Sequence, residues 1–171
     1  MIGLFITATD LKKGTIIDGS VDDDILTPFI ETAQVFHIQN YTGSKLYNRL
    51  SDGIIAGDLN PDEEYLLDNF ISDAMINYTI ADYLPFSAFK IKAGGTYAHT
   101  SDNALVASSA ELDKLSAKYK ERGEYYAKRL VEYLCKESAK YPEYTEAQTA
   151  PDITPDTSVD YAGGFYLGNS I

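Results

Sequence analysis

The sequence is poor in the residues that build disulfides, metal sites and nucleophilic catalytic sites. Its 171 residues include one cysteine, Cys135, two histidines, His37 and His99, and no tryptophan. One cysteine cannot form an internal disulfide, and zinc sites with four cysteines or with two cysteines and two histidines are excluded. The apolar runs fall far short of the ~18 residues that a membrane span needs. The N-terminus also lacks the basic segment of a secretory signal. These absences predict a soluble protein made in a reducing cytoplasm.

Basic residues are also scarce. The chain has 14 Lys and Arg against 26 Asp and Glu, a formal net charge of -12. This balance argues against a protein that wraps nucleic acid phosphates or binds an anionic membrane surface, because both depend on Lys and Arg. Hydrophobic residues make up 44% of the chain, which is enough to build a globular core.

The last 30 residues differ from the rest. Residues 142–171 hold five acidic residues and no Lys or Arg, so they carry a charge of -5 and residues 1–141 a charge of -7. The same segment contains three prolines and three glycines, which disfavour a long helix. We therefore predict one helical domain over residues 1–141 and an extended acidic and aromatic arm over residues 142–171.

Residues 1–56 have the periodicity and the capping residues of helices. Thr7 and Asp10 fit a capping box that opens a short first helix. A second helix begins in Asp22-Asp23-Asp24 and ends at Thr42-Gly43, and it tolerates Pro28 only if that residue lies in its first turn. A third helix is predicted from about residue 44 to residue 55.

The fourth helix has the clearest start. Asn60 is a predicted N-cap, Pro61 suits the first helical position, and Glu63 follows three residues after the cap. We expect this helix to run to Leu84 and to end before Pro85. Its apolar residues surround most of the helix axis, which indicates a central helix that is buried on several sides.

Residues 86–107 change to a period of two around Gly94-Gly95, which suggests a β-hairpin. A second capping box, Ser108 with Glu111, opens a long helix to about Tyr141. Gly123 lies on the apolar face of that helix and would permit the close approach of a neighbour. The predicted fold is therefore mainly α: a bundle of about four to five helices with a small β-hairpin insertion and an extended C-terminal arm.

The residue patterns indicate no catalytic site, cofactor site or metal site. We interpret His37 as a packed helix histidine, His99 as a loop histidine and Cys135 as a buried thiol. The aspartates at the start of the second helix lack the glycine and the final glutamate of a calcium loop, so we interpret them as solvated helix-start carboxylates. These are Asp18, Asp22, Asp23 and Asp24.

An enzyme that uses a pair of carboxylates is a less favoured hypothesis. Its candidates are Asp68, Asp73 and Asp82 on the central helix. Asp68 and Asp82 would lie ~21 Å apart along that helix, which is too far for two carboxylates to share a substrate atom. We therefore expect no enzymatic activity.

Tyrosine is the positive signal, with 14 residues. Tyrosine is common in protein interfaces because it is large and amphipathic and loses little side-chain entropy. Tyr125 and Tyr126 lie on different sides of one predicted helix, so at least one should leave the core. The arm adds aromatic residues suited to addition onto a neighbouring subunit. The candidate interface residues are Lys90, Lys92, Tyr125, Tyr144, Tyr161, Phe165, Tyr166 and Leu167.

Several strings resemble the head–tail connector proteins of tailed bacteriophages. The opening Leu4-Phe5-Ile6-Thr7, Asp10-Leu11-Lys12 and Asp22-Asp23-Asp24-Ile25-Leu26 is similar to connectors in general. The later strings are similar to the ring or adaptor proteins of crAss-like phages: Thr42-Gly43-Ser44-Lys45-Leu46-Tyr47-Asn48-Arg49-Leu50, Ala81-Asp82-Tyr83-Leu84-Pro85-Phe86, Phe89-Lys90-Ile91, Tyr126-Ala127-Lys128-Arg129-Leu130 and Tyr141-Pro142-Glu143-Tyr144. The resemblance covers roughly residues 4–144.

This resemblance implies a virion structural protein without enzymatic activity. Twelve copies would form a ring beneath the portal protein, extend the channel for genomic double-stranded DNA and dock the next connector or tail protein. The protein would lie at the head–tail interface of the virion, and in the host cytoplasm during assembly. An alternative is an acidic soluble adaptor or DNA-mimic inhibitor, which predicts carboxylates spaced like phosphates on one face.

Overall fold

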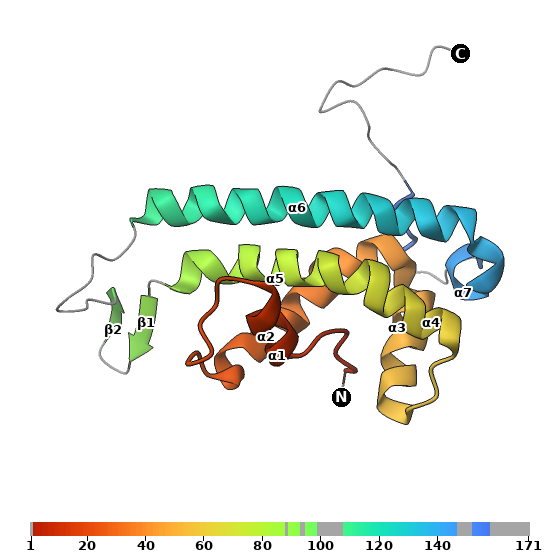
Figure 1. Cartoon of the computed structure of the whole chain (residues 1–171), viewed down its shortest axis with the longest axis horizontal. Helices are drawn as coiled ribbons and strands as arrows, with labels where there is room; N and C mark the ends of the chain where they lie inside the picture. The colour runs from red at the N-terminus through yellow and green to blue at the C-terminus, as the bar shows by residue number, and fades with distance from the viewer. Residues whose placement is uncertain (1, 88, 93–94, 99–107, 147–151, 158–171) are drawn as a thin grey trace, which may run out of the picture.

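The computed structural model describes residues 2–87, 89–92, 95–98, 108–146 and 152–157 of the chain (Figure 1). The predicted mainly α fold is confirmed. The elements are α1 (Ala8–Gly14), α2 (Asp23–Ala33), the π-helical η1 (Gln34–Ile38), α3 (Gln39–Ala56), α4 (Pro61–Leu66), the π-helical η2 (Leu67–Ile71), α5 (Ser72–Ser87), β1 (Phe89–Lys92), β2 (Gly95–Ala98), α6 (Ser109–Lys136), the 3₁₀-helical η3 (Ser138–Lys140) and α7 (Pro142–Thr145).

Two long helices organise the fold. Helices α5 and α6 run antiparallel side by side, with α1 and α2 on the other side of α5 and with α3 and α4 near its first turn (Figure 1). Eight of the residues of α5 are buried, so the prediction of a central helix is confirmed. The α5 side chains Met75 and Tyr78 pack in one cluster with Leu26, Leu50 and Leu130 from the surrounding helices.

The central helical run begins where the sequence predicts and ends later. Asn60 and Glu63 form the predicted capping box, with Pro61 at the first position, and α4, η2 and α5 then continue without a break. The prediction that the run ends before Pro85 is wrong, because α5 extends to Ser87. Proline cannot donate to the carbonyl four residues earlier, which is that of Ala81. Ser116 of α6 supplies the missing donor, with its Oγ 2.8 Å from the Ala81 oxygen.

Helix α6 begins at the predicted capping box of Ser108 and Glu111. Gly123 faces the ring of Tyr78 on α5, and a Cβ atom at this position would lie 2.9 Å from that ring. The predicted close approach at Gly123 is therefore confirmed. The helix ends at Lys136 rather than near Tyr141, and the short η3 follows it.

The sequence predicts that Pro28 lies in the first turn of its helix, and this prediction is wrong. Asp22 caps the helix and Asp23 is its first residue, so Pro28 is the sixth. The amide hydrogen bond lost at Pro28 belongs to the carbonyl of Asp24, an exposed residue. Water can serve that carbonyl, which explains why the helix continues through the proline.

Gly43 breaks the helical path at the predicted position, with φ 71° and ψ 160°. The break parts the carbonyl of Asn40 from the amide of Ser44, two groups that bond to each other in an α-helix. Residues 152–157, which we name the strap, form hydrogen bonds with both groups. The Ser44 N–H donates to the Ile153 oxygen at 3.0 Å, and the Asp156 N–H donates to the Asn40 oxygen at 2.7 Å.

The strap changes the predicted course of the C-terminal arm. The segment that follows Tyr141 forms α7, and Tyr141 and Tyr144 belong to the core. The chain then returns to α3, where the Ile153 N–H also donates to Ser44 Oγ at 3.0 Å. The extended arm therefore does not leave the body at Pro142. Residues 158–171 lie outside the described part of the chain.

The strands β1 and β2 pair antiparallel, with Phe89 opposite Ala98 and Lys92 opposite Gly95. They follow α5 directly and lie at the end of the α5–α6 pair that is farthest from α4 (Figure 1). Of the rest of the predicted insertion, residues 86–87 belong to α5, and residues 88, 93–94 and 99–107 lie outside the described residues.

Candidate assembly surfaces

The predicted interface residues fall into four groups, and the last of them is Tyr144 alone. Tyr125 is 61% exposed on α6 and is available to a partner. Lys90 and Lys92 lie on β1, opposite Tyr97 and Gly95, but the structure does not describe their side chains. Outside the described residues are Tyr161, Phe165, Tyr166 and Leu167.

Tyr144 is a correction, because it is 6% exposed and belongs to the core of its own chain. Helix α7 turns its ring inward, and its hydroxyl lies 3.7 Å from Cys135 Sγ. Burial is the main cause that raises the pKa of Tyr144. Cys135 is a second correction, since the sequence analysis predicts a buried thiol and the residue is exposed.

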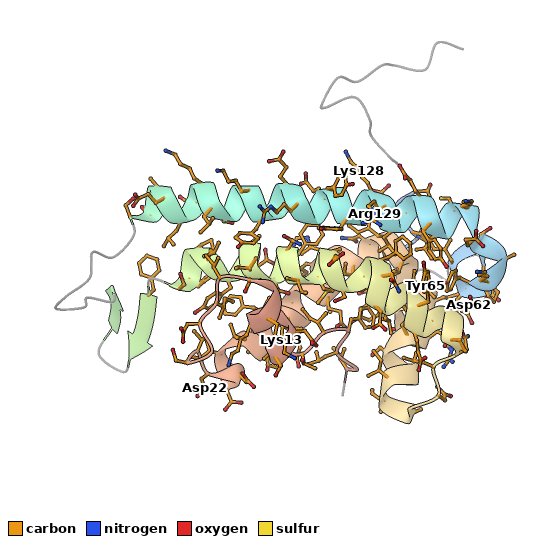
Figure 2. All side chains as sticks on the ribbon, in the orientation of Figure 1. Lys13, Asp22, Asp62, Tyr65, Lys128 and Arg129 are labelled. Atoms are coloured by element: carbon orange, nitrogen blue, oxygen red, sulfur yellow. The ribbon has the colours of Figure 1, made fainter. Side chains whose placement is uncertain are left out.

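A row of aromatic rings beside α6 was missed by the sequence analysis. Phe70 stacks on Tyr133 with the ring centroids 4.1 Å apart, and Tyr65 lies 6.0 Å from each of them. The guanidinium of Arg129 lies over the ring of Phe70 at 5.8 Å. Figure 2 shows Arg129 and Tyr65 on the side of α6 and α4 that faces the viewer.

The spacing of these rings explains why the sequence analysis missed them. Tyr65 and Phe70 are five residues apart, which places two side chains on different faces of an α-helix. Between them the chain enters the π-helical η2, whose hydrogen bonds span five residues. The wider turn brings the two rings together. A search for apolar residues with the α-helical period of 3.6 residues cannot detect this contact.

A groove of about 800 Å³ lies on the same side of α6, farther toward its start. The end of α1 and the first turns of α5 form one wall, and the side chains of Lys118, Arg122 and Tyr125 form the other. The Arg122 guanidinium lies 5.5 Å from the centre of the Tyr119 ring. Basic and aromatic side chains therefore follow one another along α6.

His37 is a partly buried helix histidine with two contacts that the sequence did not indicate. Its ring stacks on Tyr78 with the centroids 4.1 Å apart, and its Nε2 lies 3.1 Å from Asp82 Oδ2. The Tyr78 hydroxyl lies 3.2 Å from that of Tyr41, and burial is the main cause that raises the pKa of Tyr78. These contacts join η1 to α5. His99 lies outside the described residues.

The side of His37 lines a cavity of about 250 Å³ whose far wall is the strap. Thr154 and Asp156 contribute to that wall. The three carboxylates of the enzyme hypothesis do not come together at this cavity or at another shared site. Asp82 contacts His37, Asp73 lines the groove beside α6, and Asp68 is in η2.

Three of the four aspartates before and at the start of α2 have local partners for their carboxylates. Asp18 accepts from the amide of Ser20, Asp22 accepts from the amide of Asp24, and Asp23 pairs with Lys12 at 2.6 Å. The Ser20 contact is the main cause that lowers the pKa of Asp18. Within the described ranges, no group of three or more His, Cys, Asp or Glu side chains is placed to hold a metal ion.

The fold and its surface define a mainly α protein with basic and aromatic side chains along α6 and acidic ones on α2. The chain belongs to the family of unknown function DUF6712, which it matches over residues 38–153. The match includes α7 and the first residues of the strap, so it crosses the boundary predicted at residue 141. Neither the curated proteins nor the solved structures gave a match. None of the helices in the described ranges has the length and apolarity to cross a membrane.

Proposed function

We propose that this protein is a structural subunit of a tailed-phage virion, a head–tail connector that forms a ring beneath the portal protein. The ring, of twelve copies as the resemblance implies, extends the DNA channel and docks the next connector or the tail. The role is structural and not enzymatic. It places the protein at the head–tail interface of the virion.

Exposed aromatic and apolar side chains on two sides of the molecule are the observation that favours this proposal. Tyr125 of α6 is 61% exposed, and Ile25 of α2 and Phe36 of η1 are 51% and 66% exposed. Helices α2 and α6 lie on opposite sides of α5 (Figure 1). A ring subunit needs two different contact surfaces, because each copy meets one neighbour on each side.

The acidic charge also suits a DNA channel. DNA has to pass through a connector without binding, and carboxylates on the channel wall oppose tight phosphate contacts. We therefore expect acidic side chains to outnumber basic ones on the surface that faces the DNA. A ring structure with a strongly basic lumen would contradict this part of the proposal.

Assembly with a portal protein tests the proposal directly. The full chain is purified alone and together with the portal protein from the same genome, and each sample is measured by native mass spectrometry and electron microscopy. We expect a ring of about twelve copies on the portal. A chain that is monomeric alone is compatible with assembly on the partner. Failure to bind the portal would overturn the connector proposal.

The DNA-mimic alternative is tested with the same preparation. It requires carboxylates spaced like phosphates and a DNA-binding protein as the target. Two of the three aspartates at the start of α2 instead form local contacts, since Asp22 accepts from the amide of Asp24 and Asp23 pairs with Lys12. Inhibition of a DNA-binding protein by the purified chain, without portal binding, would favour the alternative.

A further inference from the structure

Two exposed stripes on opposite sides of the molecule match each other in charge and in spacing. The first, which we name the α6 stripe, consists of Lys118, Arg122, Tyr125 and Arg129, all exposed. Their spacing of four, three and four residues places them along one line of an α-helix. Figure 2 shows Arg129 on α6 and Asp22, the cap of α2, on opposite sides of α5.

The second stripe, which we name the α2 stripe, consists of Asp24, Pro28 and Glu31, also exposed and also along one helical line. Ile25 and Phe36 flank it and are exposed as well. Helix α2 and its cap hold four carboxylates and no basic residue. This stripe is therefore acidic with apolar neighbours.

The charges of the two helices are opposite. Helix α6 holds seven basic and five acidic residues, a net charge of +2, whereas the rest of the chain has seven basic and 21 acidic residues, a net charge of -14. Within the described residues, the guanidiniums of Arg122 and Arg129 lie over aromatic rings and form no ion pair, and neither Asp24 nor Glu31 forms one. Both stripes thus present charges that form no ion pair within the described chain.

The spacing of the charges is the same on both stripes. Arg122 and Arg129 are seven residues apart, as are Asp24 and Glu31, and seven residues span ~10.5 Å along an α-helix. In an antiparallel arrangement Arg122 meets Glu31 and Arg129 meets Asp24. Tyr125 then lies opposite Pro28, the exposed ring midway between the two carboxylates. Both ion pairs and the apolar contact form in one register.

We propose that the α6 stripe of one copy binds the α2 stripe of a second copy in this antiparallel register. Arginine bonds a carboxylate with two parallel N–H donors, and tyrosine and arginine dominate the energetics of many interfaces. The contact of Arg129 with Phe70 holds its side chain in place before binding, which lowers the entropy lost on association. Each contact leaves one stripe of each kind free, so copies add in one direction until a ring closes. This inference rests on the proposed ring.

A charge exchange tests the pairing. Variant one carries Arg122→Glu and Arg129→Glu, and variant two carries Asp24→Arg and Glu31→Arg. Each variant alone should self-associate at least about tenfold more weakly than the wild type, because like charges then face each other. An equal mixture should assemble again with the two variants alternating, which native mass spectrometry resolves by their masses. Circular dichroism checks that each variant is folded.

A matched control changes the charge elsewhere. Lys13 on α1 and Lys120 on α6 lie outside both stripes, so Lys13→Glu with Lys120→Glu changes the net charge as variant one does. This control should associate like the wild type. Equal weakening of the control and variant one, or no recovery in the mixture, would overturn the proposed pairing.

Cross-linking decides the matter if the wild-type chain stays monomeric. Copies with Tyr125→Cys and copies with Pro28→Cys, both with Cys135→Ser, are mixed in a glutathione buffer. A disulfide between unlike copies should form faster than with Lys120→Cys in place of Tyr125→Cys. Equal rates would refute the pairing. A chain that binds the portal as a ring, but with equal cross-linking rates and no charge-exchange effect, would leave the connector proposal intact and remove only this inference.

Discussion

Two glycines lie beneath rings from distant parts of the chain, and the two contacts differ in what supports them. Gly123 is within α6, and the ring of Tyr78 covers it inside the main core. Gly43 is at the break in α3, and the ring of Pro155 covers it from the strap. Many buried side chains support the first contact, whereas a short segment with three backbone amide bonds supports the second. We therefore expect the strap to open without unfolding of the helix pair.

The substitution Gly123→Val should have the largest effect. A Cβ atom at Gly123 would lie 2.9 Å from the Tyr78 ring, which is 1% exposed and stacks on His37 of η1, with its hydroxyl beside that of Tyr41. We expect the free energy of unfolding to fall by about 3 kcal/mol, at the upper end of the usual cost of overpacking. Urea denaturation followed by circular dichroism measures it.

The control for this substitution is Ala117→Val, at an exposed position of the same helix. It should cost only the lower helix propensity of valine, about 0.6 kcal/mol. Similar losses for the two variants would mean that the contact of Gly123 with Tyr78 is not close in solution.

The substitution Gly43→Ala should cost about 2 kcal/mol and release the strap. At φ 71° and ψ 160° Gly43 occupies a region that is almost restricted to glycine, and a Cβ atom would lie 2.6 Å from the Pro155 ring. The chain can escape this strain by closing the break, so that Ser44 bonds to Asn40 again. Hydrogen exchange should then show loss of protection at the amides of Ile153 and Asp156.

Gly57→Ala is the matched control for Gly43→Ala. Gly57 also has a positive φ, 68°, but nothing lies within 4 Å of the position of its Cβ atom. We expect a cost of about 1 kcal/mol and full protection of the strap amides. Loss of protection in both variants would show that the strap responds to general destabilisation and not to the break at Gly43.

The substitution Ser116→Ala should cost about 1 kcal/mol, the usual net value of one intramolecular hydrogen bond. Ser116 Oγ serves the carbonyl of Ala81, which Pro85 leaves without its helical donor. The same substitution in a Pro85→Ala background should cost much less, because the new amide of residue 85 takes over. A double-mutant cycle that shows no coupling between the two positions would contradict this account.

The helix pair was predictable from sequence because local rules determine it. The capping boxes at Asn60 and Ser108 and the apolar face of α6 each depend on residues a few positions apart. Gly123 on that face already indicated a close neighbour. The predicted end of α5 was wrong by three residues. The helix continues past Pro85 because Ser116, 35 positions away from Ala81, donates a hydrogen bond to the Ala81 carbonyl.

The strap and the row of rings were not predictable by the same rules. The strap bonds join residues more than 100 positions apart, such as Ser44 and Ile153. The prolines and glycines after Tyr141 indicated an extended arm but not where it would dock. Tyr125 on the surface was predicted, since it and Tyr126 lie on different sides of one helix. Tyr144 was not, because its burial depends on α7 turning back toward Cys135.

The smallest expected effect is a pH dependence that distinguishes the start of α6 from the strap. Glu111 accepts from the backbone amide and the hydroxyl of Ser108, and these bonds lower the pKa of Glu111. A lowered pKa in the folded state means that the stabilisation is fully present above the ordinary value of about 4.3 and is lost as the pH falls through the lowered value.

The three backbone amide bonds of the strap end on carbonyl groups and on the hydroxyl of Ser44, which do not titrate in this range. Between pH 7 and pH 3 the protection factor of the Ser108 amide should therefore fall while that of the Asp156 amide stays the same. In Glu111→Gln, whose side chain carries no titrating proton, the Ser108 amide should lose this dependence on pH. Loss of protection at the strap amides before the Ser108 amide on acidification would contradict this prediction. It would mean that titrating charges, and not packing, determine how easily the strap opens.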